Sequence, residues 1–151
     1  VRGLALTQSR RAAEPERARR AQGRNMTEND ISKIALDAAI EVHKELGGPS
    51  LLESCYEMAL ASELQERGLR VERQKQVPVV YKGHVVGEPY RLDLLVDDKV
   101  VIECKATEKD NPIFKAQLLT YLRLSNLKLG ILANFGKTRV VDGWERVVNG
   151  L

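Results

Sequence analysis

The chain has 151 residues, a formal net charge of +3, two Cys, and few aromatic residues: two Phe, four Tyr and one Trp. This length suits one domain with an aliphatic core, and two isolated cysteines exclude a disulfide framework or a cysteine-based zinc site. No apolar run approaches the ~20 residues that span a bilayer, so we expect a cytoplasmic protein with reduced thiols.

Most of the positive charge lies in residues 1–25. Seven Arg against two Glu give this segment +5, and since the whole chain carries +3, residues 26–151 carry −2. The segment shows no apolar periodicity, so we expect a disordered Arg-rich N-terminal extension. It is either an upstream extension ahead of Met26 or a basic arm that follows phosphates. The remaining chain is not basic, so nucleic-acid binding must be argued from a local site.

Two helices are predicted next. The first runs from a cap at Thr27 or Asn29 to the breaker at Gly47, because apolar residues recur at helical spacing between them. The second covers residues 51–67 and places Glu53 in its first turn. The apolar stripes of the two helices are Ile31, Ile34, Ala35, Ala38, Val42 and Leu46, and then Leu52, Tyr56, Ala59, Leu60 and Leu64.

Three strand candidates follow, and after them a helix, a buried strand and a final strand or short helix. Pro78 suggests that the first strand lies at a sheet edge, because proline cannot donate to a neighbouring strand. The order ααβββαβ(β) predicts an α/β fold with a mixed sheet flanked by helices. The ranges are 70–81, 88–96 and 99–106 for the strands, 111–124 for the helix, and 127–135 and 138–148 for the last two elements.

Two of these strands carry acids where a buried strand should be apolar. Asp93 precedes a short polar turn, and Glu103 and Lys105 follow it on one face of the next strand. If residues 97–99 form a three-residue turn, Asp93 lies directly opposite Glu103, with Cβ atoms about 5 Å apart. A two-residue turn would send the two acids to opposite faces. A shared site therefore requires an odd-numbered turn or a bulge.

Asp93, Glu103 and Lys105 are sufficient for phosphodiester hydrolysis. The two acids can ligate one Mg²⁺ or Mn²⁺, with the Cys104 carbonyl and waters at other positions. Such a metal lowers the pKa of a bound water and neutralises phosphate charge, and Lys105 can orient that water or stabilise the developing charge. The same spacing is also typical of a hairpin with solvated charges on its wet face.

The rest of the chain resembles the PD-(D/E)XK nuclease superfamily, particularly its RecB-like branch. Those nucleases show an Asp before a hairpin, a Glu-x-Lys on the next strand and a Gln-x-x-x-Tyr helix, matched here by Gln117 and Tyr121. The stretch 29–149 is closer still to the bacterial GxxExxY family, whose first Gly is replaced here by Ser50, which can still cap the helix. The resembling segments are residues 38–47, 51–56, 79–83 and 129–135.

The resemblance implies a restriction-endonuclease-like fold over residues 26–151 and a metal-dependent nuclease that acts on nucleic acid, in the first place DNA. Asp93 and Glu103 would hold Mg²⁺ or Mn²⁺, Glu53 would support the metal directly or through water, and Lys105 would serve the attacking water. Gln117 and Tyr121 would line the substrate channel.

Simpler roles remain open for some of these residues. Glu53 can be a helix-dipole contact, and Tyr121 can be a core residue with a satisfied hydroxyl. Cys104 is expected to face the core. The charge of −2 over residues 26–151 leaves an alternative function, a non-catalytic nucleic-acid-binding or adaptor module of a larger defence or repair complex. The small size is compatible with a homodimer or another partner.

Overall fold

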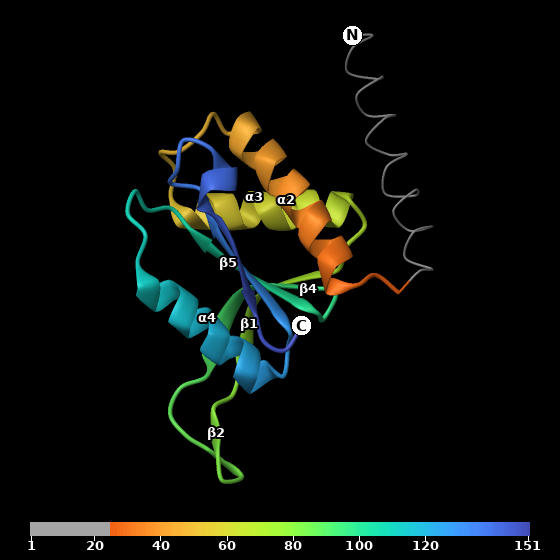
Figure 1. Cartoon of the computed structure of the whole chain (residues 1–151), viewed down its shortest axis with the longest axis vertical. Coiled ribbons are helices and arrows are strands. Elements are labelled where there is room, and N and C mark those ends of the chain that lie inside the picture. The colour runs from red at the N-terminus through yellow and green to blue at the C-terminus, as the bar shows by residue number, and fades with distance from the viewer. Residues whose placement is uncertain (1–24) are drawn as a thin grey trace.

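The computed structural model describes residues 25–151 (Figure 1), so the extension predicted over residues 1–25 lies outside this range except for Asn25. Within it, no helix is long and apolar enough to cross a membrane. The elements are α2 (Glu28–Glu45), α3 (Glu53–Glu66), β1 (Val71–Val77), β2 (Val80–Tyr81), β3 (His84–Val85), β4 (Tyr90–Val96), β5 (Val100–Lys105), α4 (Pro112–Ser125), β6 (Leu129–Asn134), the 3₁₀ helix η1 (Val140–Gly143) and β7 (Trp144–Val148).

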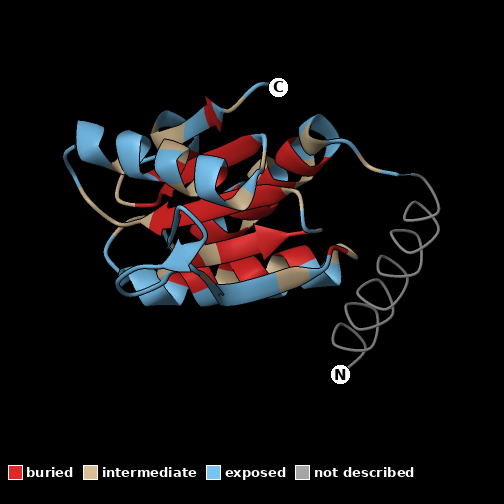
Figure 2. Cartoon of the chain, turned by 90° about the horizontal axis from the view of Figure 1, so that it is seen from below, coloured by how far each residue is buried: buried red, intermediate tan, exposed pale blue. Residues whose placement is uncertain are grey.

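The predicted α/β fold with a mixed, helix-flanked sheet is confirmed. Five strands lie in the order β1-β4-β5-β6-β7, in which only β5 and β6 are parallel neighbours. The buried residues concentrate in the sheet, between helices whose outer faces are exposed (Figure 2). One apolar cluster joins the sheet to α2 and α3, and a second joins its other face to α4. The position of β1 at the edge agrees with the expectation from Pro78.

Thr27, rather than Asn29, caps α2. The Thr27 hydroxyl accepts a hydrogen bond from the Asp30 N–H (3.2 Å), and the Asp30 carboxylate accepts one from the Thr27 N–H (2.9 Å). This reciprocal pair satisfies two N–H groups that the first helical turn would otherwise leave without partners. The helix ends before Gly47, whose φ of 83° suits glycine.

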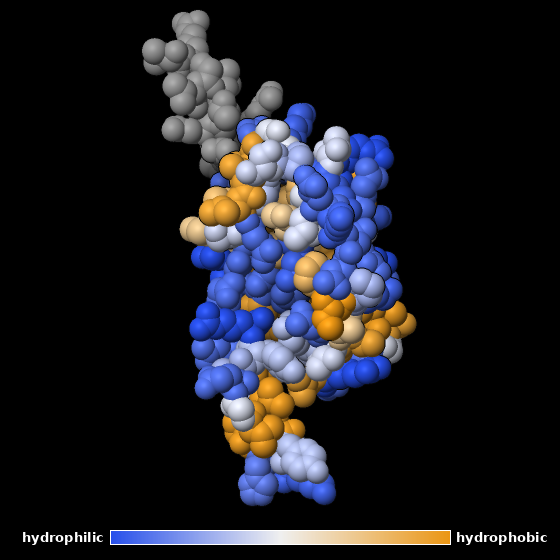
Figure 3. Space-filling model, turned by 90° about the vertical axis from the view of Figure 1, so that its left-hand side faces the viewer, coloured by the Kyte–Doolittle hydropathy of each residue, from blue (hydrophilic) through white to orange (hydrophobic). Residues whose placement is uncertain are grey.

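The single strand predicted over residues 70–81 is wrong in its second half. β1 ends at Val77, and β2 and β3 form a separate two-stranded hairpin that projects from the body of the molecule (Figure 1). Pro78 cannot donate a ladder hydrogen bond, and positive φ angles at Lys82 and Gly83 form the tight turn. The hairpin exposes apolar side chains, visible at the lower end of Figure 3, among them Val80, Tyr81 and Val85.

One other expectation is corrected, and one pair of alternatives is decided. Leu52 is not part of the buried stripe of α3, because the helix begins one residue later and Leu52, its N-cap residue, is 75% exposed. Residues 138–148 form both of the predicted alternatives in succession, the short helix η1 and then the strand β7.

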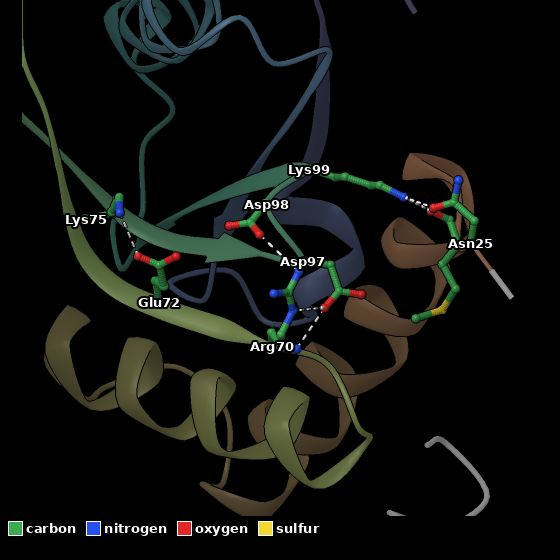
Figure 4. A network of polar contacts seen from close by, with 8 residues as sticks. Asn25, Arg70, Glu72, Lys75, Asp97, Asp98 and Lys99 are labelled. Atoms are coloured by element: carbon green, nitrogen blue, oxygen red, sulfur yellow. Dashed lines mark hydrogen bonds and ion pairs between the residues drawn. The ribbon is translucent and has the colours of Figure 1, made fainter. Parts of the chain in front are cut away.

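The turn between β4 and β5 has three residues, the odd length that a shared site of Asp93 and Glu103 requires. Asp97 and Asp98 have φ angles of 48° and 55°, which aspartate tolerates better than most residues. Arg70 holds the turn from the neighbouring chain segment: its N–H donates to Asp97 Oδ1 (2.8 Å) and its Nη2 to Asp98 Oδ2 (3.0 Å) (Figure 4). On the other side, Lys99 Nζ donates to the Met26 carbonyl (2.6 Å). The strand register that follows is Leu94 opposite Ile102, Leu95 opposite Val101 and Val96 opposite Val100.

The loop between α2 and α3 is held by a buried tyrosine. The Tyr56 hydroxyl donates to the Gly48 carbonyl (2.7 Å) and accepts from the Leu51 N–H (3.2 Å). Its ring stacks on Phe135 with centroids 4.7 Å apart. Ser50 does not cap α3, contrary to expectation, because the N-cap residue is Leu52 and no side chain makes a cap hydrogen bond to this helix. Instead Ser50 has a φ of 135°, a backbone conformation that glycine adopts and other residues avoid.

Replacing Ser50 with glycine should therefore stabilise the protein. We expect Ser50→Gly to raise the free energy of unfolding by about 1 kcal/mol, because glycine has no Cβ to strain at this φ. Urea unfolding measures the change. The matched control is Ser62→Gly in the middle of α3, which should lose about 0.5 kcal/mol since glycine is the poorer helix former. A destabilised Ser50→Gly variant would contradict the assignment of strain to this position.

Candidate functional site

The site lies where β4 and β5 stop pairing through their backbones. The ladder between them ends at Leu94 and Ile102. Beyond this point two side chains accept hydrogen bonds from the backbone of the opposite strand. The Asp93 N–H donates to Glu103 Oε1 (3.1 Å), and the Cys104 N–H donates to Asp93 Oδ2 (2.9 Å). Each acid thus holds the backbone of the opposite strand, and the structure brings Asp93 and Glu103 side by side as predicted. The Cys104 side chain is fully buried in the core, also as expected.

Glu103 is buried beside another acid. Only 7% of the residue is exposed. Burial, and then the charge of Asp93, raise the pKa of Glu103 to about 8, although the Asp93 N–H and Lys105 act in the opposite direction. A carboxyl group in these surroundings is stabilised by a proton or by a bound cation.

Lys105 lies at the end of β5, held by its backbone and by an aromatic ring. Its carbonyl accepts a hydrogen bond from the Phe135 N–H (2.8 Å). Its Nζ lies 4.4 Å from the centre of the Phe114 ring, within the range of a cation–π interaction. Beside it a pocket of about 90 Å³ opens between α4, β6 and β7, lined in part by Lys105, Phe114 and Trp144. The lysine therefore lines this pocket and also acts electrostatically on Glu103.

Glu53 is the first residue of α3 and interacts electrostatically with the strand residues. Its surroundings raise the pKa of Glu53: desolvation acts most, Lys105 opposes it, and the charges of Asp93 and Glu57 add to it. Glu53 is thus within electrostatic range of the strand residues although it is itself exposed. Among residues 25–151, however, no group of three or more His, Cys, Asp or Glu side chains is placed to hold a metal ion. The structure therefore does not assemble the three-acid metal set of Asp93, Glu103 and Glu53.

Helix α4 carries the remaining two predicted residues. Leu118 packs directly on Gly130 of β6, where an added Cβ would lie 2.8 Å from the leucine side chain. The half-buried Tyr121 lies with its ring 4.6 Å from that of Tyr90. Burial, and then the charges of Glu103, Tyr90 and Asp93, raise the pKa of Tyr121, which puts its hydroxyl in range of the acids. Gln117 is exposed one turn earlier on the same helix, and no side-chain hydrogen bond within residues 25–151 joins it to the acids.

Two polar residues of the site are absent from the sequence-based set. Glu57 is buried on α3 and accepts a hydrogen bond from Gln74 Nε2 of β1 (2.7 Å). The same nitrogen lies 3.5 Å from Asp93 Oδ1. The sequence could have identified Glu57 as a site residue, because it follows Glu53 by one helical turn inside an apolar stripe. The sequence offered no comparable indication for Gln74, since it belongs to a run of exposed polar residues in an edge strand.

Asn134 is a third residue that the sequence did not reveal as part of the site. Its amide accepts from the Thr107 N–H (3.1 Å) and donates to the Thr107 carbonyl (2.9 Å). It thereby fixes the chain just after Lys105. A polar residue at the end of an otherwise apolar strand was the available signal.

The fold and the site together define a class of protein. A mixed sheet between helices, with an Asp on one strand and a Glu-x-Lys on the next, is the arrangement of restriction-endonuclease-like proteins. A family model described as the PD-(D/E)XK nuclease superfamily matches residues 29–147, and the chain belongs to this superfamily. No curated protein and no solved structure matches the chain.

Members of this superfamily are mostly phosphodiester hydrolases that typically use a divalent metal. The residues present fit such an ion. Asp93 and Glu103 supply the hard carboxylate oxygens that Mg²⁺ and Mn²⁺ prefer. A bound cation would also offset the burial of Glu103 and the charge of Asp93, the two main causes that raise the pKa of Glu103.

The protonation of Glu103 should make the stability of the metal-free protein depend on pH. Between the ordinary glutamate pKa of 4.5 and about 8, the folded state keeps a proton that the unfolded state has released. The free energy of unfolding should therefore fall as the pH rises through this window, by at most about 1.4 kcal/mol per pH unit. Urea unfolding in EDTA from pH 5 to 8 measures the slope. Glu103→Gln should reduce the slope and be the more stable protein at pH 8; equal slopes in the two proteins would contradict the raised pKa.

Proposed function

We propose that this protein is a metal-dependent nuclease that hydrolyses phosphodiester bonds in DNA. The observation that carries the proposal is the exchange of hydrogen bonds between Asp93 and Glu103 across β4 and β5, with Lys105 two residues further on. Membership in the PD-(D/E)XK superfamily supports it, since a nuclease superfamily implies a nucleic-acid substrate.

Each residue then has a role that follows from its chemistry. Asp93 and Glu103 would hold Mg²⁺ or Mn²⁺, and Glu53 would support the ion from α3 through a water molecule. When bound, the ion supplies Lewis acidity and lowers the pKa of its water. Lys105 orients the attacking water and stabilises the negative charge that develops on the phosphate. The cation–π contact with Phe114 helps to keep the lysine ammonium at this position.

Substrate binding has to rest on local contacts, because residues 26–151 carry a net charge of −2. Gln117 and Tyr121 lie one helical turn apart on α4 and so share a face. We assign them to the sugar–phosphate backbone of the substrate. The pocket beside Lys105 is lined in part by Phe114 of the same helix.

Within the superfamily we place the chain with the GxxExxY proteins. The two hydrogen bonds of Tyr56 to the loop before α3 support this. They fix the loop from which the helix with the glutamate of the motif begins, so they explain why the motif contains both residues. The glycine-like φ of Ser50, at the motif's first position, supports it as well.

A non-catalytic nucleic-acid-binding or adaptor module of a larger complex is the second candidate. The net negative charge of residues 26–151 favours it, because proteins that bind nucleic acid by themselves commonly present a basic surface. The same observation suits a homodimer or a partner protein that completes the binding surface.

A cleavage assay tests the nuclease proposal. Wild-type protein should cut single- or double-stranded DNA in Mg²⁺ or Mn²⁺ and lose the activity in EDTA. Asp93→Asn, Glu103→Gln and Lys105→Ala should each lower the rate at least about 100-fold. Lys128→Ala is the matched control, since Lys128 is exposed and lies at the opposite end of the parallel β5–β6 pair. Its rate should equal that of wild type.

Two outcomes would overturn the nuclease proposal. One is the absence of cleavage of any DNA or RNA by wild-type protein under these conditions. The other is an unchanged rate in Lys105→Ala. Salt-dependent DNA binding that survives both EDTA and Glu103→Gln, without cleavage, would instead establish the non-catalytic module.

The roles of Gln117 and Tyr121 are tested by kinetics. Gln117→Ala should raise KM about tenfold with little change in kcat, since the loss of one hydrogen bond to a charged phosphate affects ground state and transition state alike. Tyr121→Phe keeps the ring and removes only the hydroxyl, so it should raise KM if that hydroxyl contacts substrate. Thr120→Ala, on another face of α4, is the control. An unchanged KM in Tyr121→Phe would leave Tyr121 as a packing residue.

A further inference from the structure

Strand β1 has an unusual backbone beside the site. The register between β1 and β4 is the same on both sides of Gln74, with Arg73 opposite Leu94 and Lys75 opposite Leu92. Gln74 itself has a φ of 52°, in the left-handed region. A side chain larger than hydrogen is strained there, and such strain persists only where other contacts compensate for it. Gln74 lies directly across from Asp93 in this register.

At Gln74 and Asp93, alternate side chains of both strands switch from one face of the sheet to the other. Val71 packs against the apolar cluster of α2 and α3, whereas Val77 packs against the cluster of α4. In a regular strand, residues six apart point to the same side. Strand β4 behaves likewise, because Leu94 belongs to the first cluster and Leu92 to the second. The sheet therefore twists locally at Gln74 and Asp93 without a change of register.

This twist brings two successive side chains of β1 to one acid. Arg73 Nε lies 3.6 Å from Glu57 Oε1, and Gln74 Nε2 lies 2.7 Å from the same oxygen. Neighbouring residues of a regular strand would point to opposite faces and could not share a partner. The left-handed backbone of Gln74 is what turns its amide toward the site.

The amide of Gln74 suits a position between two acids. Its nitrogen carries two N–H donors, one of which serves Glu57 while the other faces Asp93 Oδ1 at 3.5 Å. A carboxylate at this position would repel both neighbours. Asp93 Oδ2 is already occupied by the Cys104 N–H. A carboxylate oxygen has more than one lone pair, so Asp93 Oδ1 can face Gln74 and still ligate a cation.

We propose that Gln74 is a positioning residue of the nuclease site: anchored on Glu57, its amide orients the Asp93 carboxylate for a divalent cation. The inference rests on the proposed function, since it requires Asp93 to bind that cation. An exposed residue in an edge strand gains no burial from a left-handed backbone, so packing of its own side chain does not account for the strain. The contacts to Glu57 and Asp93 do.

Paired substitutions separate the effect of the strained Gln74 backbone from the effect of its side-chain amide. Gln74→Gly and Gln74→Ala remove the same amide, but only glycine relaxes at a φ of 52°. We expect thermal unfolding of the metal-free protein to show Gln74→Gly a few degrees more stable than Gln74→Ala. Isothermal titration with Mn²⁺ should show both variants binding about tenfold more weakly than wild type, the usual loss when a group that orients a metal ligand is removed.

Gln76 provides the matched control on the same strand. It is an exposed glutamine in β1 without the left-handed backbone. At this position the order of stability should be reversed, since glycine weakens a regular strand relative to alanine. The Mn²⁺ affinity of both Gln76 variants should equal that of wild type.

The outcomes distinguish this inference from the proposed function. Wild-type protein that binds no Mn²⁺ overturns both. Wild-type protein that binds Mn²⁺, together with a Gln74→Gly variant that binds it equally well, overturns the role of Gln74 alone. The same holds if the Mn²⁺ affinity of the two Gln74 variants follows their stability, because the residue would then act only on the fold.

Discussion

The candidate site depends on one exchange of hydrogen bonds, in which Asp93 and Glu103 each hold the backbone of the opposite strand. At this point the β4–β5 ladder ends, and backbone N–H groups inside a protein must find other partners. The two carboxylates supply them. The same bonds force two acids together in a largely buried place, which raises the pKa of Glu103 to about 8. A proton or a divalent cation relieves this repulsion, so the interaction that completes the sheet also creates the site.

Other parts of the fold keep this arrangement in place. The turn between β4 and β5 has the odd length that sets the acids opposite each other, and Arg70 holds it. Tyr56 fixes the loop that starts α3 at Glu53. At Ser50 and Gln74 the backbone has positive φ without glycine. Both residues lie in segments that lead to site residues, whereas the other non-glycine residues with positive φ lie in turns or at a helix end, namely Lys82, Asp97, Asp98 and Asn126.

The success of the sequence-based predictions follows the range of the interactions involved. The cap at Thr27, the extent of α4 and the buried strand β6 were predicted well, because periodicity and capping are local properties. The strand predicted over residues 70–81 was wrong because β-branched residues continue past Pro78, while the sheet does not. Leu52 was misplaced for a similar reason, since helical spacing alone does not say where the first turn begins.

The sequence by itself determined the order Asp93, Glu103, Lys105 on two strands joined by a short turn. These residues are close in the chain, so alternation along a strand and the length of a turn are enough to bring them together. Only the tertiary structure decided that Glu57 and Gln74 join them and that Glu53 lies in electrostatic range. Those relations depend on how α3 packs on the sheet and on a local twist in β1, which arise from contacts between distant segments and leave no periodic trace in the sequence.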